Sequence, residues 1–378
     1  MKLIFDVSDK PKAGQLVVFA LQQMLAILAA TIAVPLIIGN GLTPAAAMFG
    51  AGVGTIVYIL FTKRKSPVFL GSSFAFLGSM AAAFAGGVSM QLGMLGLIVG
   101  AFLAGLVYVV IAIVVKFVGV GWLNKLMPAV VIGPTVAIIG LSLAGNAIGD
   151  LVKGDVTKQV TEYAVSTDSG TPEIIETVSN VPVGSSYVAL ICGLITLAVV
   201  MLCSTYGKKT LRLIPFIIGI LAGYAAAAIF TVIGNICDID ALKIVDFSVF
   251  SSYMLTDGSV SLKTFVSLPD FAFVSGLKGL KEFDFTYFAT IFVAYVPVAL
   301  VVFAEHVADH KNLSSIIDHD LLEEPGLTRT LLGDGVGSIA GALFGGCPNT
   351  TYGESVACVA ITGNASVVTT VSYTHLRA

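Results

Sequence analysis

The run FTYFATIFVAYVPVALVVFA, from Phe285 to Ala304, contains no charged residue and is followed directly by Glu305. A second uncharged run extends from Leu16 to Ile38. Each run is long enough to cross the hydrocarbon core of a bilayer as a helix, which takes about 20 apolar residues. The two runs therefore predict membrane-spanning helices, and the later helix meets an acidic residue where its apolar run ends.

The whole chain shares this apolar character. Hydrophobic residues make up 56% of its 378 positions and charged residues 11%, against roughly a quarter charged in soluble domains. This composition excludes a soluble globular protein and makes membrane lipid an expected partner. No patch of basic and aromatic residues is present, so we expect no nucleic-acid partner. The five cysteines lack the spacing of metal ligands, and we predict neither a metal site nor a cofactor.

Apolar runs bounded by charges or turn residues predict nine spans and the start of a tenth near Tyr352. Basic residues concentrate in alternate connections, as at Lys63, Arg64 and Lys65. Since basic loops stay in the cytoplasm, we predict a multi-pass protein of the cytoplasmic membrane with a cytoplasmic N-terminus. Two long connections, 149–185 and 234–284, are expected outside. The nine spans are 16–38, 44–61, 67–85, 92–115, 126–148, 187–203, 213–233, 285–307 and 328–344.

Two segments at membrane depth are poor helix formers. They are VFLGSSFAF, from Val68 to Phe76, and GGCPNTTYG, from Gly345 to Gly353. Non-helical backbone is tolerated at this depth only where it is buried in protein or lines a cavity. Paired broken segments indicate the substrate site of a transporter, because the helix that resumes after each one presents free N–H groups. The alternative is a pair of re-entrant loops shaped by packing alone.

Ionisable residues cluster where the eighth span ends. Glu305 and Asp309 are four residues apart and share one helix face, whereas His306 and His310 lie on a neighbouring face. Ionisable groups inside a membrane are expensive and usually functional, so the face with the two acids is the candidate. We expect His310 and Lys311 to cap the cytoplasmic end of this span in water.

Glu354 is a second candidate at membrane depth. It opens a helix directly after the second broken segment, where the positive end of the helix dipole stabilises a carboxylate. The alternative is a simple helix cap. Two carboxylates beside two broken segments favour a substrate site.

Five stretches resemble the nucleobase-cation symporter 2, or nucleobase-ascorbate transporter, family, and within it the bacterial uracil permeases. The resemblance follows nearly the whole chain in order. Its motifs are QQMLAILAATIAVP (22–35), GSSFAF (71–76), GWLNKLMPAVVIGPTVAIIGLSLAG (121–145), AEHVADH (304–310) and PNTTYGE (348–354).

The resemblance implies an all-α polytopic fold of seven plus seven spans in inverted repeats, with short strands in the broken spans 3 and 10. Residues 1–120 and 285–371 would belong to a core domain with spans 1–4 and 8–10 and the start of span 11. Residues 121–284 would form a gate domain with spans 5–7 and two long extracellular loops. The chain would be truncated near the tenth or eleventh span, and the polar stretch 372–378, SYTHLRA, would be a non-native tail.

The resemblance also implies roles in binding and coupling. Glu305 and Glu354 would accept hydrogen bonds from the N–H groups of uracil, and the backbone N–H groups of Phe74 and Gly353 would donate to its carbonyls. A pyrimidine dione alternates such donors and acceptors around its ring. The remaining residues expected at the substrate are Ala30, against the ring, and Tyr352. The residues expected in proton coupling are Glu305, Asp309, Tyr352 and His310.

The chain departs from the family pattern at three places. It has Gln22 and Gln23 where a Gln-His pair is common, and Asp309 where uracil permeases have a histidine. The signature after the second acid is missed at Ser355 and Ala357. These departures leave the partner in proton coupling open.

The function predicted from these residues is proton-coupled uptake of uracil, with the proton as coupling ion. A carboxyl group in a dry site favours its neutral form, so Glu305 is the expected proton carrier. The alternatives are a xanthine, urate or other nucleobase permease, an anion transporter of related fold, an intramembrane hydrolase and an inactive fragment. A second copy of the chain, in a homodimer, is a further expected partner.

Overall fold

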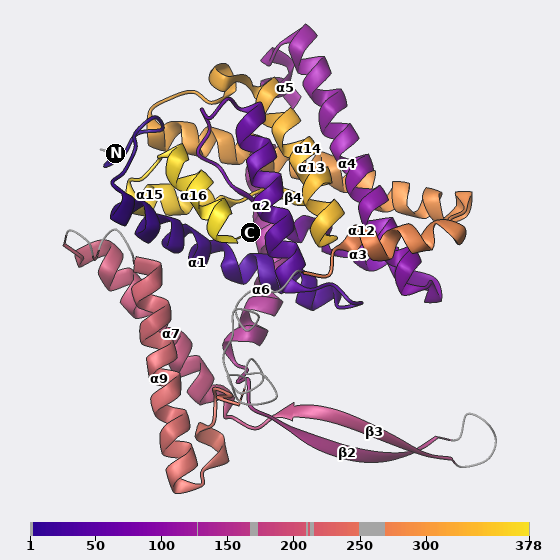
Figure 1. Cartoon of the computed structure of the whole chain (residues 1–378), viewed down its shortest axis with the longest axis vertical. Coiled ribbons are helices and arrows are strands. Elements are labelled where there is room, and N and C mark those ends of the chain that lie inside the picture. Colours follow the sequence, from indigo (N-terminus) through magenta and orange to yellow (C-terminus); the bar gives the residue numbers. More distant parts are fainter. Residues whose placement is uncertain are drawn as a thin grey trace. The chain divides into compact units, whose positions relative to one another are not determined.

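The computed structural model describes residues 3–126, 128–166, 173–208, 211, 215–248 and 269–377 (Figure 1). The chain forms two compact units. The first contains Met1–Ser142 and Leu268–Ala378, and the second contains Leu143–Leu211 and Pro215–Ser267. The first unit carries both predicted substrate-binding acids, and each unit is described by itself.

Apart from α13, the long helices of the first unit follow the predicted spans to within a few residues. Its broken third span is strand β1 (Leu70–Ser72), the turn η1 (Phe74–Phe76), helix α3 (Leu77–Ala83) and the turn η2 (Ala85–Gly87). Its broken tenth span is strand β4 (Asn349–Thr351) followed by helix α15 (Gly353–Thr362). The other elements are α1 (Ala13–Ile38), α2 (Pro44–Phe61), α4 (Met90–Val118), α5 (Gly121–Leu126), the first part of α6 (Ala129–Leu151), α12 (Ala272–Gly276), η4 (Leu277–Lys281), α13 (Phe285–Ile317), η5 (Leu322–Gly326), α14 (Leu327–Gly345) and α16 (Val367–Arg377).

In its described residues the second unit contains the end of α6, a helix pair and a hairpin. Helix α7 (Ser186–Tyr206) packs against α9 (Pro215–Cys237), and the turn η3 (Asp240–Leu242) follows them. Strands β2 (Thr157–Ser166) and β3 (Glu173–Pro182) pair antiparallel. This hairpin lies in the first long connection and was not part of the predicted all-α fold.

Among the described residues, five helices are long and apolar enough to cross a membrane: α2, α4, α7, α9 and α13. Helix α13 corrects the predicted span 285–307, because it continues to Ile317 and ends at Asp318 in the left-handed conformation. The cluster that begins at Glu305 therefore lies inside a helix rather than at its end. Charged residues do not end a helix when buried residues continue on its packed face beyond them, as they do here up to Ile317.

Helices α2 and α14 approach each other through glycines. A Cβ on Gly50 would lie 2.3 Å from the carbonyl oxygen of Gly341, and one on Gly54 would lie 2.7 Å from that of Gly337. Small residues four apart allow such close approach of helices in membranes. The side-chain amide of Asn349 donates to the carbonyl oxygen of Gly50 at 3.1 Å. The start of β4 is thereby attached to α2, beside α14 (Figure 1).

Helices α4 and α13 build much of the apolar core. Tyr287 donates from its hydroxyl to the carbonyl oxygens of Ala83, at 2.7 Å, and Leu92, at 3.1 Å. Tyr295 is fully buried and stacks on Phe76, with ring centroids 5.6 Å apart. These contacts hold α13, which carries Glu305 and Asp309, against η1, α3 and the start of α4.

Three predictions about organisation stay predictions. They are the core and gate domains, the inverted repeat, and a non-native tail at 372–378. The backbone of α16 runs through most of that stretch, whereas side chains from residue 373 onward lie outside the described part of the chain.

We expect Gly341→Ala to destabilise the protein, because its Cβ would lie 1.9 Å from Nδ2 of Asn349. Overpacking of this kind costs about 1–3 kcal/mol. Thermal unfolding of the detergent-purified protein, followed by circular dichroism, measures the effect. Gly14→Ala in α1 is the control, since its Cβ would meet no atom within 4 Å. Equal unfolding temperatures for the two variants would contradict the close packing of α2 on α14.

Candidate functional site

The two broken segments meet as a two-stranded antiparallel sheet. Leu70 is opposite Thr351, Gly71 opposite Thr350, and Ser72 opposite Asn349. The backbone N–H of Ser73 donates to the carbonyl oxygen of Pro348 at 2.9 Å and extends the pairing. Segments that are far apart in the sequence thus satisfy each other's backbone groups, as predicted for non-helical chain at membrane depth.

Tyr352, in the second broken segment, contacts the first broken segment and stabilises this sheet. Its ring lies against Gly71, where a Cβ would come within 2.2 Å of the ring, so only glycine fits there. The Tyr352 hydroxyl donates to the carbonyl oxygen of Ser72. Tyr352 is buried, and Ala20, Phe69 and Phe74 belong to the same apolar cluster. Its position supports a structural role beside the site, and its coupling role stays a prediction.

Both segments continue into helical turns whose first residues are predicted donors. Phe74 opens η1 and Gly353 opens α15, and the N–H groups of a helix's first turn have no partner within the helix. Phe74 is half-buried, whereas Gly353 and Glu354 are exposed in the structure. Glu354 lies in the first turn of α15, where the helix dipole favours a carboxylate.

The acidic face of α13 points to the same place. The Glu305 side chain is half-buried, and its Oε2 has no hydrogen-bond partner within the described residues. Asp309 is buried, and its Oδ2 accepts a hydrogen bond from the Thr351 hydroxyl at 3.1 Å. A Cβ on Gly353 would lie 3.9 Å from Oδ1 of Asp309. Asp309 therefore connects α13 to the end of β4 and to the start of α15.

Four carboxyl groups act on one another here. The charged groups that act on Glu305, within the described part of the chain, are Asp309, Asp334 and Glu354. They come from α13, α14 and α15. Like charges in a water-poor site repel strongly, so such a cluster favours binding of a proton or of hydrogen-bond donors.

Asp334 is a residue that the sequence prediction missed. It is buried in α14, lies 2.6 Å from Nδ1 of His306, and accepts a hydrogen bond from the backbone N–H of Thr351. One carboxylate thus joins the helix of Glu305 to the strand that precedes Glu354. The missed signal was an ionisable residue inside the predicted span 328–344, which by itself marks a candidate functional site.

The two histidines of α13 are both buried, which corrects the prediction that His310 lies in water. His306 contacts Asp334 and, through Nε2, the hydroxyl of Thr330 at 3.1 Å. The rings of His306 and His310 are 4.1 Å apart between centroids, in agreement with the shared face expected from their spacing. Lys311 is exposed as expected. Burial follows from the continuation of α13 against α2 and α14.

The side chain of Ala30 lies outside the described residues, although its backbone belongs to α1. Its contact with substrate stays a prediction. So do the substrate and proton roles of the other candidates, Glu305, Glu354, Phe74, Gly353, Tyr352, Asp309 and His310.

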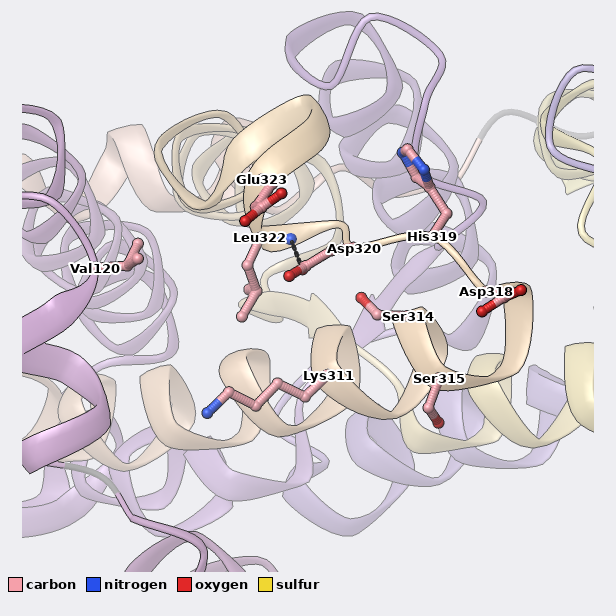
Figure 2. Close-up of a pocket in the computed structure, with 9 residues that line it drawn as sticks. All are labelled: Val120, Lys311, Ser314, Ser315, Asp318, His319, Asp320, Leu322 and Glu323. Carbon is pink, nitrogen blue, oxygen red and sulfur yellow. Dashed lines mark hydrogen bonds between the residues drawn. The ribbon is translucent and has the colours of Figure 1, made fainter.

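A cavity of about 580 Å³ lies elsewhere, at the turn from α13 to α14 (Figure 2). Its wall combines Lys311 on α13 with acidic residues of the turn, such as Asp320 and Glu323. Oδ1 of Asp320 accepts a hydrogen bond from the backbone N–H of Leu322 at 2.8 Å, which shapes this wall. The cavity does not include the paired strands, so we do not assign the substrate to it.

Comparison with known proteins identifies the family of the chain. Residues 14–374 match a permease family. The chain is 34% identical over 363 residues to a uracil permease of Bacillus caldolyticus, covering 96% of this chain and 70% of the relative. It is 33% identical over 361 residues to a uracil permease of Bacillus subtilis, with the same coverage, and 31% identical over 356 residues to one of Escherichia coli, covering 94% and 68%.

The apolar helices and the polar site held between them define an integral membrane transporter. The chain belongs to the permease family of nucleobase-ascorbate transporters. Its relatives are permeases and not enzymes, which removes the alternative of an intramembrane hydrolase.

We expect Asp334→Ala to destabilise the protein by about 3 kcal/mol or more, because it leaves two buried donors, on His306 and Thr351, without their acceptor. Asp334→Asn should lose less, since its amide oxygen still accepts one hydrogen bond. Thermal unfolding in detergent measures both variants, and Glu282→Ala, at an exposed acid, is the control. If Asp334→Ala unfolds at the same temperature as Glu282→Ala, Asp334 does not join α13 to β4.

Proposed function

We propose that this protein takes up uracil across the cytoplasmic membrane, together with a proton. The observation that carries this proposal is the meeting of β1 and β4, with an acidic helix face and the first turn of α15 beside them. The uracil permeases among its relatives, at 31–34% identity over most of the chain, support the same substrate.

The chemistry of uracil suits the groups gathered around the strands. Its ring presents two N–H donors and two carbonyl acceptors. Glu305 and Glu354 supply carboxylate acceptors for the N–H groups, and the backbone N–H groups of Phe74 and Gly353 supply donors for the carbonyls. Ala30 would limit the space beside the ring. Hydrogen bonds to a charged partner are about twice as strong as neutral ones, so Glu354 would contribute most of the polar recognition. Glu305 would still accept through its carbonyl oxygen when it carries the proton.

The same cluster provides a reason for proton coupling. A carboxyl group near three other acids is most easily accommodated when it is protonated. We assign the coupling proton to Glu305, which is both near the substrate groups and surrounded by acids. Asp309 replaces the histidine of related uracil permeases and accepts from Thr351, so it is the candidate that receives the proton from Glu305. Tyr352 holds the two paired strands together through Ser72, next to the strand residue that binds Asp309.

Transport would follow from movement of a core domain, built on the spans of the first unit, against a gate domain. Proton and uracil would bind from outside and leave on the cytoplasmic side, where the N-terminus would lie. This orientation rests on the basic residues of alternate connections, such as Lys63, Arg64 and Lys65.

Purified protein in proteoliposomes should accumulate radiolabelled uracil when the outside is made acidic. Unlabelled uracil should compete and unlabelled xanthine should not. Glu354→Gln should weaken the apparent affinity about tenfold or more, because it replaces one charge-assisted hydrogen bond by a neutral one. The measurement is the initial uptake rate as a function of uracil concentration.

The matched control for this substitution is Glu282→Gln. Glu282 is an exposed acid directly after η4, so this variant should keep the wild-type affinity. Competition by xanthine but not by uracil would assign the protein to purine transport instead. Affinity for uracil that is equal in Glu354→Gln and Glu282→Gln would remove Glu354 from the substrate site.

Glu305→Gln should abolish uracil accumulation driven by a proton gradient, because a neutral amide cannot take up and release the proton. Asp309→Asn should retain binding but flatten the dependence of uptake on pH, if Asp309 receives that proton. Uptake at a series of external pH values, with and without an ionophore that collapses the gradient, measures both effects.

Gradient-driven accumulation that survives in Glu305→Gln would show that another group carries the proton. An unaltered pH profile in Asp309→Asn would exclude Asp309 from the coupling path. Replacing sodium by choline throughout is the control for the coupling ion, and wild-type uptake should not depend on it.

A further inference from the structure

Tyr58 of α2 makes buried polar contacts that neither the predicted site nor the proposed mechanism uses. Its hydroxyl lies 2.7 Å from Nε2 of His310 and 2.8 Å from Oγ of Ser66. All three side chains are fully buried. Nδ1 of His310 lies 2.8 Å from the carbonyl oxygen of His306. A chain of hydrogen bonds therefore leads from the segment after α2 to the turn of α13 that begins at Glu305.

The direction of these hydrogen bonds follows from the partners. A carbonyl oxygen only accepts, so Nδ1 of His310 carries the hydrogen that it shares with His306. In a neutral imidazole Nε2 is then an acceptor, and the Tyr58 hydroxyl must donate to it. The Tyr58 oxygen in turn accepts from the Ser66 hydroxyl. Tyr58 thus donates to one neighbour and accepts from the other, so its hydroxyl is needed for both of them to be satisfied.

The hydrogen bonds of Tyr58 add to those that Asp334 makes with the same part of α13. The neighbouring rings of His306 and His310 are held by α14 through Asp334 and by α2 through Tyr58. The backbone of the same turn is held as well, because Ser314 donates from its hydroxyl to the carbonyl oxygen of His310 at 2.6 Å. Two helices from different parts of the chain thus hold the imidazole face of α13. Since a helix is rigid over one turn, they also orient the neighbouring face with Glu305 and Asp309.

We propose that Tyr58 is a positioning residue for transport, whose hydrogen bond to His310 sets the rotation of the α13 turn that presents Glu305 and Asp309. The inference rests on the proposed function, because those two acids are assigned there to substrate and proton. The charged groups that act on Tyr58 from the neighbouring elements are Asp334 on α14 and Asp309 on α13. Tyr58 itself touches neither substrate nor proton carrier.

The test is Tyr58→Phe in proteoliposomes. It removes one hydroxyl, keeps the ring, and leaves Nε2 of His310 without its donor. We expect the maximal rate of uracil uptake to fall about fivefold or more, the equivalent of one ordinary hydrogen bond. The uracil concentration at half-maximal rate should change less than the rate does, because Glu354, the proposed substrate ligand, lies on α15 and not on α13. The pH profile of uptake should shift.

The chain offers a closely matched control in Tyr295→Phe. Tyr295 is also fully buried and lies on α13, yet its hydroxyl has no hydrogen-bond partner within the described residues. This variant should keep the wild-type rate and pH profile. The loss in Tyr58→Phe combined with His310→Leu should be smaller than the sum of the two single losses, because both substitutions break the hydrogen bond between Tyr58 and His310. Additive losses, or Tyr58→Phe kinetics equal to those of Tyr295→Phe, would overturn the proposal.

A second measurement does not depend on uracil transport. The infrared absorption of protonated carboxyl groups, recorded on the purified protein as pH is varied, should differ between Tyr58→Phe and wild type and not between Tyr295→Phe and wild type. Identical spectra in all three proteins would overturn the positioning role. If wild-type protein moves no uracil but the spectra differ as expected, the proposed substrate fails while the positioning of the acids stands.

Discussion

Inside a bilayer no water is available to hydrogen-bond the backbone, so every N–H and C=O group at that depth needs a partner within the protein. Residues 70–72 and 349–351 leave the helical conformation, and they satisfy this requirement by pairing with each other as β1 and β4. The pairing brings the first turns of η1 and α15 to one place. The acids of α13 are arranged around it, and Asp309 contacts Thr351 at the end of β4.

Polar contacts from three directions then determine how α13 is oriented. Thr351 of β4 binds Asp309, Asp334 of α14 binds His306, and Tyr58 of α2 binds His310. Buried polar groups are rarely left without a partner, so rotation of α13 would break several hydrogen bonds at once. The glycines of α2 and α14 make this arrangement possible, because they bring the two helices close enough for Asn349 to reach Gly50.

Much of this architecture could be predicted from local pattern. Hydropathy located the spans, poor helix formers marked both broken segments, and the helical period placed Glu305 with Asp309 and His306 with His310. Other features escaped it. Local pattern ends α13 at the first charges and so places His310 in water, although burial against α2 and α15 continues the helix to Ile317. Asp334 was passed over as one charge in an apolar run, because its partners lie on other segments.

The sequence by itself determined that the chain resides in a membrane, where its spans lie, where the backbone leaves the helix, and which acids are at membrane depth. These properties follow from the free energy of transferring each side chain out of water and from the helical period within a single segment. Only the tertiary structure decided that Leu70 faces Thr351, that Asp334 joins His306 to β4, and that Tyr58 meets His310. Such partners are chosen by the packing of segments that are distant in the chain, and no local pattern of hydrophobicity or charge specifies them.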